Sequence, residues 1–329
     1  MGFFRGENLG YPTLGDARTS GECEEYSSSS KYVQDAHIGL PARGLEIVSL
    51  GLAESAFRVE SVTHLAHKGE TLSAAREQHT HTILVLQPDE NCGPDRIAAW
   101  SAAHGVDLAV YNMGVSTEMP SSLDGYDGLI VLGGDMGDRD TAEYPWLEDM
   151  RERLREAHRT HVPALGVCLG AQLLASALGG EVELGEPGLE TGVVDIRVTD
   201  EGARDPLLQG ISDVFHSGSM HNDAVVRLPA DAVLLARGDV YPHQAFRSGS
   251  TWAVQFHPEV SPASYERWVG LEDHSANPEL QARFEASVED FWCRDDLVAP
   301  ECERLVGNFL SVVKGTTQLP APQAASTVG

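Results

Sequence analysis

The strongest constraint on the fold of this chain is the segment 166–172, which reads GVCLGAQ. The apolar run before it, 162–167, predicts a buried strand, and residues 171–178 favour a helix because they include good helix formers. Cys168 would then lie at the sharp turn between strand and helix. Glycines on either side let the two elements pass closely, with no Cβ in the way. The pattern is typical of a nucleophile elbow, which strains one residue and points its side chain at a substrate.

The same position favours a reactive thiol. At the N-terminus of a helix, the partial positive charge and the free N–H groups favour thiolate, the reactive form of cysteine. The alternative for this local motif is a buried structural cysteine, which is a common fate of the residue. Catalytic partners of Cys168 elsewhere in the chain would decide in favour of the first interpretation.

A second motif supplies such partners about ninety residues downstream. The apolar strand predicted at 251–256 is followed by His257, Pro258 and Glu259. Residues two apart in an extended chain point to the same side, so His257 and Glu259 can face Cys168 together. Pro258 biases His257 toward extended geometry, which leaves the pair little conformational freedom to lose. The sequence therefore predicts a Cys-His-Glu triad in which His257 carries protons and Glu259 orients and stabilises its ring.

A third motif provides candidate donors for an oxyanion. The attack of a thiolate on an amide carbon creates a negatively charged oxygen, which needs fixed hydrogen-bond donors. The strand predicted at 128–132 runs into Gly133, Gly134 and Asp135, where missing side chains allow a backbone N–H to approach a substrate. We expect the N–H groups of Gly134 and Leu169 to be the two donors. Taken alone, the segment would indicate an ordinary turn from a strand to a loop.

Together these motifs resemble the class I, triad-type glutamine amidotransferase domain, and specifically the standalone relatives of the glutaminase domain of GMP synthetase. The resemblance spans roughly residues 82–313 and keeps the motifs in the order of the family. Segments 220–223 and 243–246, which read MHND and HQAF, are similar to a His-x-Asp loop and an Asn/Gln-Ala-Phe strand of the family. Asp135 departs from the proline that many relatives have after the two glycines, which affects the expected shape of the oxyanion loop.

The resemblance implies that the substrate is L-glutamine. It implies that Gln172, one helical turn beyond the nucleophile, helps to hold this substrate. Backbone groups near Gln244 and Ala245 would cradle its amino acid end. The substrate-binding residues that we expect are Gly133, Gln172, His221, Asp223, Gln244 and Ala245.

The implied reaction is hydrolysis of the side-chain amide of glutamine to glutamate and ammonia, through a glutamyl thioester on Cys168. No metal ion and no organic cofactor are expected. In the family the ammonia normally reaches a second active site, which in GMP synthetase lies in an ATP pyrophosphatase domain with a glycine-rich phosphate loop. About seventy residues follow Glu259 and they contain no such loop. We therefore expect the partner to be a separate synthetase or acceptor enzyme.

Two other functions stay open at the level of sequence. A hydrolase for other γ-glutamyl amides would use the same triad, with a pocket opened toward a larger leaving group. The loops 118–125 and 185–190 are the segments that we expect to decide between the substrates. An interaction module without activity would use the fold alone, and the complete triad argues against it.

The sequence from residue 82 onward alternates between predicted strands and helices. The strands are 82–86, 108–111, 128–132 and 162–167, and the helices are 94–104, 146–158 and 171–178. This alternation indicates an α/β fold with a doubly wound, mostly parallel sheet and helices on both faces. The resemblance implies a flavodoxin-like core. Ligands of such sheets bind beyond the carboxyl ends of the strands, where Gly134 and Cys168 fall.

The remaining segments divide the chain into four regions. Shorter β elements are expected near 193–198, 225–228, 233–236 and 251–256, followed by helices at 279–292 and 300–313 with an acidic linker between them. Residues 1–42 are rich in glycine, serine and acidic residues and have little periodicity, which is typical of a mobile arm. The regions are this arm (1–42), an N-terminal extension whose structure the sequence does not fix (43–81), the glutamine amidotransferase domain (82–314) and a disordered tail (315–329).

The composition argues against several classes of partner. The formal net charge of −27 argues against nucleic acid, because an acidic surface repels phosphate. No stretch approaches the roughly 18 consecutive apolar residues that a membrane helix needs, so no membrane association is expected. The N-terminus lacks the apolar core of a secretory signal, so we expect the protein in the cytoplasm. The five cysteines lie too far apart in the sequence for a zinc site.

Overall fold

The computed structural model describes residues 80–271 and 273–317. These residues include nearly all of the domain that the sequence predicts. The predicted arm (1–42), the predicted extension apart from its last two residues, and the part of the tail beyond residue 317 lie outside them.

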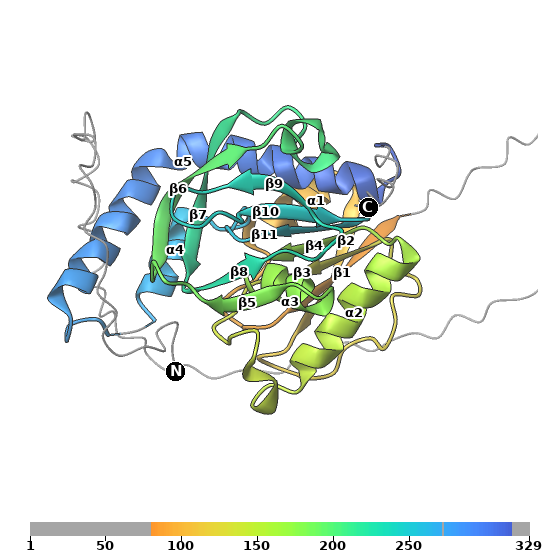
Figure 1. Ribbon diagram of the computed structural model, residues 1–329, viewed down its shortest axis with the longest axis horizontal. Helices are drawn as coiled ribbons and strands as arrows, with labels where there is room; N and C mark the ends of the chain where they lie inside the picture. The colour runs from red at the N-terminus through yellow and green to blue at the C-terminus, as the bar shows by residue number, and fades with distance from the viewer. Residues whose placement is uncertain (1–79, 272, 318–329) are drawn as a thin grey trace, which may run out of the picture. The chain divides into compact units, whose positions relative to one another are not determined.

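Parallel strands form the half of the main sheet that contains the elbow. The sheet has nine strands in the order β2-β1-β3-β4-β11-β10-β9-β6-β7, and Figure 1 shows them crossing the middle of the domain. The first five, in which all neighbours are parallel, are β2 (Val106–Asn112), β1 (His81–Gln87), β3 (Gly128–Val131), β4 (Ala164–Val167) and β11 (Thr251–Val254). The α/β fold predicted from the alternation of strands and helices is confirmed.

The other half of the sheet is antiparallel. Beyond β11, each strand runs antiparallel to its neighbour. These strands are β10 (Ala245–Ser248), β9 (Val233–Arg237), β6 (Glu190–Val198) and β7 (Val214–His221). A separate antiparallel pair consists of β5 (Glu181–Leu184) and β8 (Asp223–Arg227). The shorter β elements expected in this part of the chain are therefore present. Those at 193–198 and 233–236 lie in the antiparallel half, the one at 225–228 lies in the separate pair, and the one at 251–256 is β11 beside the elbow strand.

Helices cover both faces of the parallel strands (Figure 1). They are α1 (Asp95–Ala103), α2 (Trp146–Thr160), α3 (Leu169–Ala177), α4 (Pro262–Val269) and α5 (Pro278–Val313), with short 3₁₀ turns at 140–142, 202–204 and 206–208. Successive side chains of a strand point to opposite faces. On β1, Ile83 and Val85 join a buried cluster with α1 and α5, whereas Leu84 and Leu86 join a cluster with α2 and α3. This division confirms the doubly wound arrangement.

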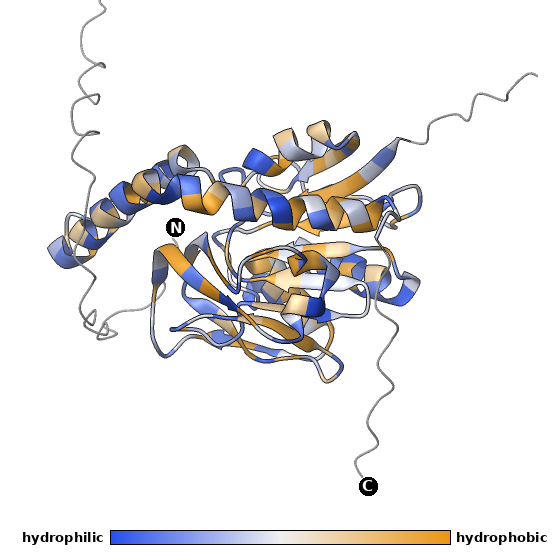
Figure 2. Cartoon of the chain, turned by 90° about the horizontal axis from the view of Figure 1, so that it is seen from above, coloured by the Kyte–Doolittle hydropathy of each residue, from blue (hydrophilic) through white to orange (hydrophobic). Residues whose placement is uncertain are grey.

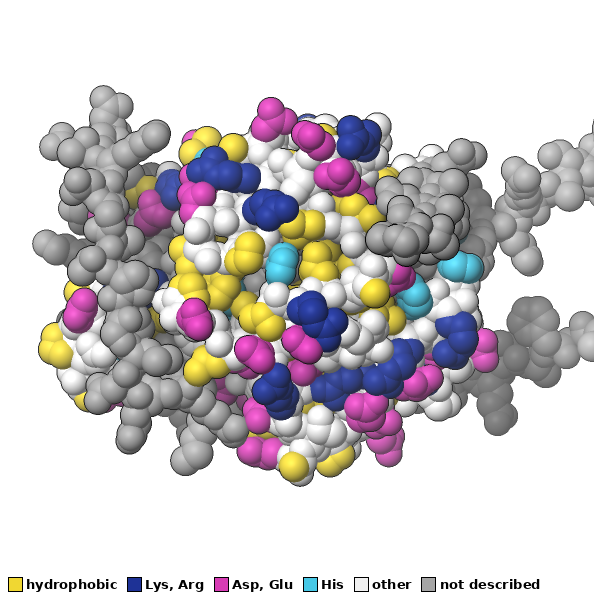
Figure 3. All heavy atoms as spheres, viewed as in Figure 1, with side chains coloured by type: hydrophobic (Ala, Val, Ile, Leu, Met, Phe, Trp, Pro, Cys, Tyr) yellow, Lys and Arg dark blue, Asp and Glu magenta, His cyan; other side chains and the backbone are white. Residues whose placement is uncertain are grey.

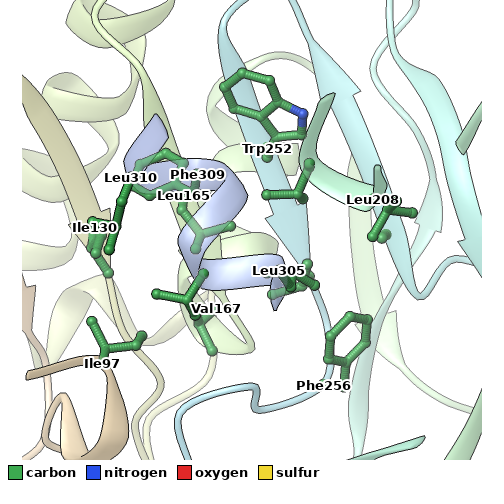
Figure 4. Close-up of a cluster of buried hydrophobic side chains, with 14 of the residues drawn as sticks. Ile97, Ile130, Leu165, Val167, Leu208, Trp252, Phe256, Leu305, Phe309 and Leu310 are labelled. Carbon is green, nitrogen blue, oxygen red and sulfur yellow. The ribbon is translucent and has the colours of Figure 1, made fainter. Parts of the chain in front are cut away.

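The cluster under α5 fixes the position of the elbow strand. Leu165 and Val167 of β4 are fully buried in it. Figure 4 shows Leu305 and Phe309 of α5 in the same cluster, together with Trp252 of β11. Burying side chains of this size contributes about 2 kcal/mol each. The packing holds the carboxyl ends of β3, β4 and β11 at one edge of the sheet, where the candidate site lies.

The two C-terminal helices predicted from the sequence are one helix. α5 is 36 residues long and continues through Pro300, and Figure 2 shows it running without a break along the domain. The prediction of a linker was wrong because it rested on the proline and on the charged residues before it. Phe291 and Val298 on the inner side of that stretch are buried. Their packing outweighs the hydrogen bond that a proline removes from a helix.

The outer surface of the helices is strongly charged. Arg151 and Arg155 of α2 both pair with Glu148, and Arg153 pairs with Glu156. Figure 3 shows basic side chains lying among acidic ones on the face of the molecule that carries α2. Across residues 80–271 and 273–317, no helix combines the length and the apolar character needed to cross a membrane.

Pro300 allows a test of why α5 is continuous, because its side chain is exposed. Alanine is favoured over proline in a helix interior by about 3 kcal/mol. Replacing proline also raises the conformational entropy of the unfolded chain, which lowers the free energy of unfolding by about 1 kcal/mol. We therefore expect Pro300→Ala to raise the free energy of unfolding by about 2 kcal/mol in chemical denaturation. Glu303→Ala, at an exposed position of the same helix, is the control. A destabilised Pro300→Ala variant would show that the helix depends on the proline.

Candidate active site

Cys168 lies at the sharp turn between β4 and α3. Its backbone has φ 51° and ψ −106°, a conformation that residues with a Cβ rarely adopt. Hydrogen bonds hold the turn on both sides. The N–H of Cys168 donates to the carbonyl of Val254 at 2.8 Å, and its own carbonyl accepts from the N–H of Ala171 at 2.9 Å. Cys168 is therefore held in the strained conformation that the elbow pattern predicts.

Glycines let the elements of this turn approach one another. A Cβ on Gly166 would collide with the backbone of Gly170, and a Cβ on Gly170 would collide with the carbonyl of Val131 on β3. A Cβ on Gly133 would lie 2.8 Å from Cε1 of His257. None of the three positions can take a larger residue unless the backbone or the histidine ring moves. The close packing of β3, β4 and α3 thus requires glycine at 166 and 170, and Gly133 leaves room for the His257 ring.

The predicted base lies next to the elbow, directly after β11. Nδ1 of His257 is 2.7 Å from Oε1 of Glu259. Both residues are buried, with 2% and 1% of their surface exposed. The His257 ring also packs edge-on against Trp268, with ring centroids 4.9 Å apart. Because the carboxylate accepts a hydrogen bond from Nδ1, Nε2 is the nitrogen that can exchange a proton with Cys168 or with a substrate.

The charges around His257 favour its protonated form. Burial alone would lower its pKa, but the negative charges of Glu259 and Cys168 outweigh burial and raise the pKa of His257 to about 10. At neutral pH the ring is therefore an imidazolium that can donate a proton.

A cavity of about 310 Å³ opens beside Cys168. Besides Cys168, five of the residues that the sequence predicts at the site line it, namely Gly134, Leu169, Gln172, His221 and Asp223. They come from the loop after β3, from the start of α3, from the end of β7 and from the start of β8. Leu169 is the first residue of α3, so its N–H has no partner within the helix. The structure thus brings the elbow, the expected oxyanion donors and the MHND segment to one cavity.

Three of the predicted substrate-binding residues lie outside the lining of this cavity, as do His257 and Glu259. Gly133 lies against the His257 ring. Ala245 is the first residue of β10, and Gln244 before it is fully buried, with its Nε2 donating to Glu190 at 2.8 Å. Contacts of Gln244 and Ala245 with a substrate therefore stay predictions. In the structure, the side chain of Gln244 contacts the buried carboxylate of Glu190.

Glu190, which the sequence did not single out, belongs to the same group of side chains. Its Oε2 accepts hydrogen bonds from Nε2 of His221 at 3.0 Å, from Ser219 at 3.2 Å and from Gln244. Burial would raise the pKa of Glu190, but the hydrogen bonds and the charge of His221 outweigh burial and lower it. No local pattern marks this residue, because its partners come from other segments of the chain.

Gln255 is a second site residue that the sequence analysis did not select. Its Nε2 lies 3.6 Å from Sγ of Cys168, and only 2% of the residue is exposed. A signal for it exists in the sequence. Gln255, His257 and Glu259 are spaced two apart, and in the extended chain expected from the sequence they would point to the same side. In the structure β11 ends at Val254, and Pro258 and Glu259 lie in a turn.

The loop after the predicted oxyanion glycines is anchored to α2 and α3. Asp138 is buried. Its Oδ1 accepts a hydrogen bond from the hydroxyl of Ser176 at 2.6 Å and pairs with Arg151 at 3.2 Å. Asp135 stands in this loop where many relatives have proline. The loop is held three residues later, at Asp138, by these contacts with α2 and α3.

The side chains at the cavity suit nucleophilic attack on an acyl carbon. They offer a thiol at a helix N-terminus, a histidine that can give and take a proton, and backbone N–H groups for an oxyanion. In the part of the chain that the structure describes, no group of three or more His, Cys, Asp or Glu side chains could hold a metal ion.

Comparisons with known proteins identify a family to which this chain is similar. Residues 96–269 match the family model "Glutamine amidotransferase class-I". A subunit of the glutamine-hydrolyzing GMP synthase of Halobacterium salinarum is 35% identical over 165 residues, which are 47% of this chain and 81% of that protein. The protein of the same name from Methanothrix thermoacetophila is 34% identical over 154 residues, which are 46% of this chain and 77% of that protein.

Solved structures show the same fold. A glutamine amidotransferase of Methylobacillus flagellatus superposes with a TM-score of 0.62 at 25% identity, over 74% of this chain and 98% of that one. A glutamine amidotransferase of Thermotoga maritima also gives a TM-score of 0.62, at 22% identity, over 71% of this chain and 98% of that one.

The raised pKa of His257 links stability to pH. A histidine in an unfolded chain titrates near pH 6.5, so the folded protein holds an extra proton between that pH and about 10. The resulting stabilisation is complete below pH 6.5 and is lost as the pH rises toward 10. We expect the difference in free energy of unfolding between wild type and His257→Gln to shrink between about pH 6 and about pH 9.5 in urea denaturation.

Leu165→Ala is the control for this measurement, because it destabilises the core without removing a titratable group. Its difference from wild type should not change with pH. If the His257→Gln difference stays constant or grows as the pH rises, the pKa of His257 is not raised in the folded protein.

Proposed function

Because this chain belongs to the class I glutamine amidotransferase family, we propose that it hydrolyses the side-chain amide of L-glutamine with Cys168, His257 and Glu259. The position of Cys168 carries the proposal. This residue occupies a strained turn at the N-terminus of α3, between the His257–Glu259 pair and a cavity. A thiol in that place can attack an acyl group bound in the cavity.

The first half of the reaction forms a thioester. The thiolate of Cys168 attacks the carboxamide carbon, and the N–H groups of Gly134 and Leu169 stabilise the oxyanion. The His257 imidazolium donates its proton to the departing nitrogen, so that ammonia leaves and a glutamyl thioester stays on Cys168. Its raised pKa suits this acid step, because the ring carries a proton at neutral pH.

The second half of the reaction releases glutamate. His257, now neutral, takes a proton from water as the water oxygen attacks the thioester carbon. The thiolate of Cys168 leaves, and the imidazolium is restored for the next cycle. Glu259 keeps the ring in one orientation and balances its charge in both halves. The sum is glutamine and water converted to glutamate and ammonia.

We propose that the ammonia passes to a separate synthetase. The similar proteins from Halobacterium salinarum and Methanothrix thermoacetophila are each named as one subunit of a glutamine-hydrolyzing GMP synthase. Their names imply that another chain completes the enzyme, and this supports a partner that uses the ammonia. The first candidate for that partner is the ATP-dependent subunit of such a synthase.

The direct test of this function is release of glutamate from glutamine, compared with release from a panel of γ-glutamyl amines. We expect the purified chain to prefer glutamine, and a Cys168→Ala variant to lose the activity while it keeps its fold by circular dichroism. Faster turnover of a γ-glutamyl amine would instead make the protein a γ-glutamyl amide hydrolase.

Labelling with a glutamine-like diazo-ketone provides the matched control for Cys168→Ala. Burial raises the pKa of the Cys302 thiol to about 12, so Cys302 should stay unlabelled and Cys302→Ala should stay active. The label should map to Cys168. A label on Cys92 or Cys302, or wild-type turnover by Cys168→Ala, would refute the assignment of the nucleophile.

The roles of His257 and Glu259 predict unequal losses. His257→Ala removes the group that carries protons, so kcat should fall nearly as far as in Cys168→Ala. Glu259→Gln should leave measurable activity, because an amide can still hold the ring but cannot balance the imidazolium charge. Steady-state kinetics on glutamine measure both variants. Near-wild-type rates in both would mean that another pair of residues supplies the base.

A further inference from the structure

We propose that Gln255 stabilises the Cys168 thiolate by donating an amide N–H to Sγ, and that the backbone carbonyl of Asp223 fixes the direction of this donation through Gln172. The inference rests on the proposed function in taking Cys168 as the nucleophile. It adds a residue that acts on the sulfur before any substrate arrives, whereas the oxyanion donors act only after attack.

The direction of the chain of hydrogen bonds starts at the carbonyl of Asp223. A backbone carbonyl can only accept hydrogen bonds. Nε2 of Gln172 lies 2.9 Å from this oxygen, and Nδ1 of His221 lies at the same distance. Gln172 must therefore present its NH₂ group, and not its oxygen, to the carbonyl.

The orientation of Gln172 determines that of Gln255. Nε2 of Gln172 is also 3.4 Å from Oε1 of Gln255, which suits the second N–H of the same NH₂ group. Gln255 thus turns its oxygen toward Gln172 and its NH₂ group toward Cys168. A flipped Gln255 amide would set its NH₂ group against that of Gln172 and an oxygen against the sulfur. The contact between the two NH₂ groups would be unfavourable in either state of the sulfur, and an oxygen against the sulfur would be unfavourable for the thiolate.

The contact with sulfur is a donated hydrogen bond in a buried place. Nε2 of Gln255 lies 3.6 Å from Sγ. Gln172, Gln255 and Cys168 are 3%, 2% and 5% exposed, so little water competes for the sulfur. A hydrogen bond to a charged acceptor is worth more than one to a neutral acceptor, particularly where water is excluded. The contact therefore favours the thiolate over the thiol.

A buried carboxylate supports the far end of this chain. Oε2 of Glu190 lies 3.0 Å from Nε2 of His221 and accepts the Nε2 donor of Gln244 at 2.8 Å. Both ring nitrogens of His221 consequently face oxygen acceptors. The ring lies between the Glu190 carboxylate and the Asp223 carbonyl. Gln244 acts here by fixing Glu190.

The test measures the reactivity of the thiol without glutamine. Iodoacetamide is a small neutral electrophile that alkylates thiolates and needs no glutamine site. The second-order rate of alkylation of Cys168, followed by peptide mass spectrometry, is compared across pH for wild type, Gln255→Met and Gln255→Glu. Gln281→Met, on α5 and away from the cavity, is the control for the change of glutamine to methionine, and thermal unfolding checks each fold.

We expect Gln255→Met to slow alkylation at neutral pH by about tenfold or more, since a hydrogen bond to a charged group is lost. Gln255→Glu should be slower still, because it sets a carboxylate against the sulfur. The rates should converge with wild type at high pH, where the thiol is ionised in every variant. Wild-type rates at neutral pH in folded Gln255→Met, or a loss of the same size at every pH, would overturn the proposal.

The link through Gln172 has its own readout. Once Gln255 is methionine, the orientation of Gln172 no longer reaches the sulfur. The double variant Gln172→Met/Gln255→Met should therefore alkylate within about twofold of Gln255→Met. If the double variant instead alkylates more slowly than Gln255→Met by the full factor that Gln172→Met alone produces, Gln172 does not act through Gln255. Slower alkylation of Cys168 in Gln255→Met could be observed even if the protein did not hydrolyse glutamine. The experiment therefore tests this proposal separately from the proposed function.

Discussion

The close approach of β3, β4 and α3 is the constraint on which the rest of the site depends. Gly166 and Gly170 allow it, because a Cβ at either position would collide with backbone. The chain must turn sharply where β4 ends, and Cys168 takes a positive φ of 51° as a result. Strain of this kind costs about 1–3 kcal/mol and persists only when the surroundings over-determine it. The buried cluster between the sheet and α5 supplies that support.

The second determinant is charge in a place with little water. His257 and Glu259 are both buried, so their ion pair is screened less than one on the surface. The raised pKa of His257 follows from that pairing and from the nearby sulfur. The amide chain from Gln172 to Gln255 adds a neutral donor on another side of the same sulfur. A cation and an oriented dipole thus act together on one atom.

The sequence predicted those parts of the molecule whose signals are local. An apolar run, a cysteine and two glycines define the elbow, and His257 and Glu259 are two residues apart in one strand extension. Glu190 could not be found in this way, because it meets Gln244 across 54 residues of chain. The continuity of α5 was also hidden, since a proline among charged residues resembles a linker until the burial of Phe291 and Val298 is known.

Partitioning of the reaction by hydroxylamine tests the central claim, that the strained elbow makes Cys168 a nucleophile that forms a glutamyl thioester. A thioester is attacked by hydroxylamine as well as by water. The account predicts that added hydroxylamine diverts part of the glutamate into γ-glutamyl hydroxamate, in proportion to its concentration. Glutamate as the only product at every hydroxylamine concentration would mean that water attacks the amide directly, and would contradict the account.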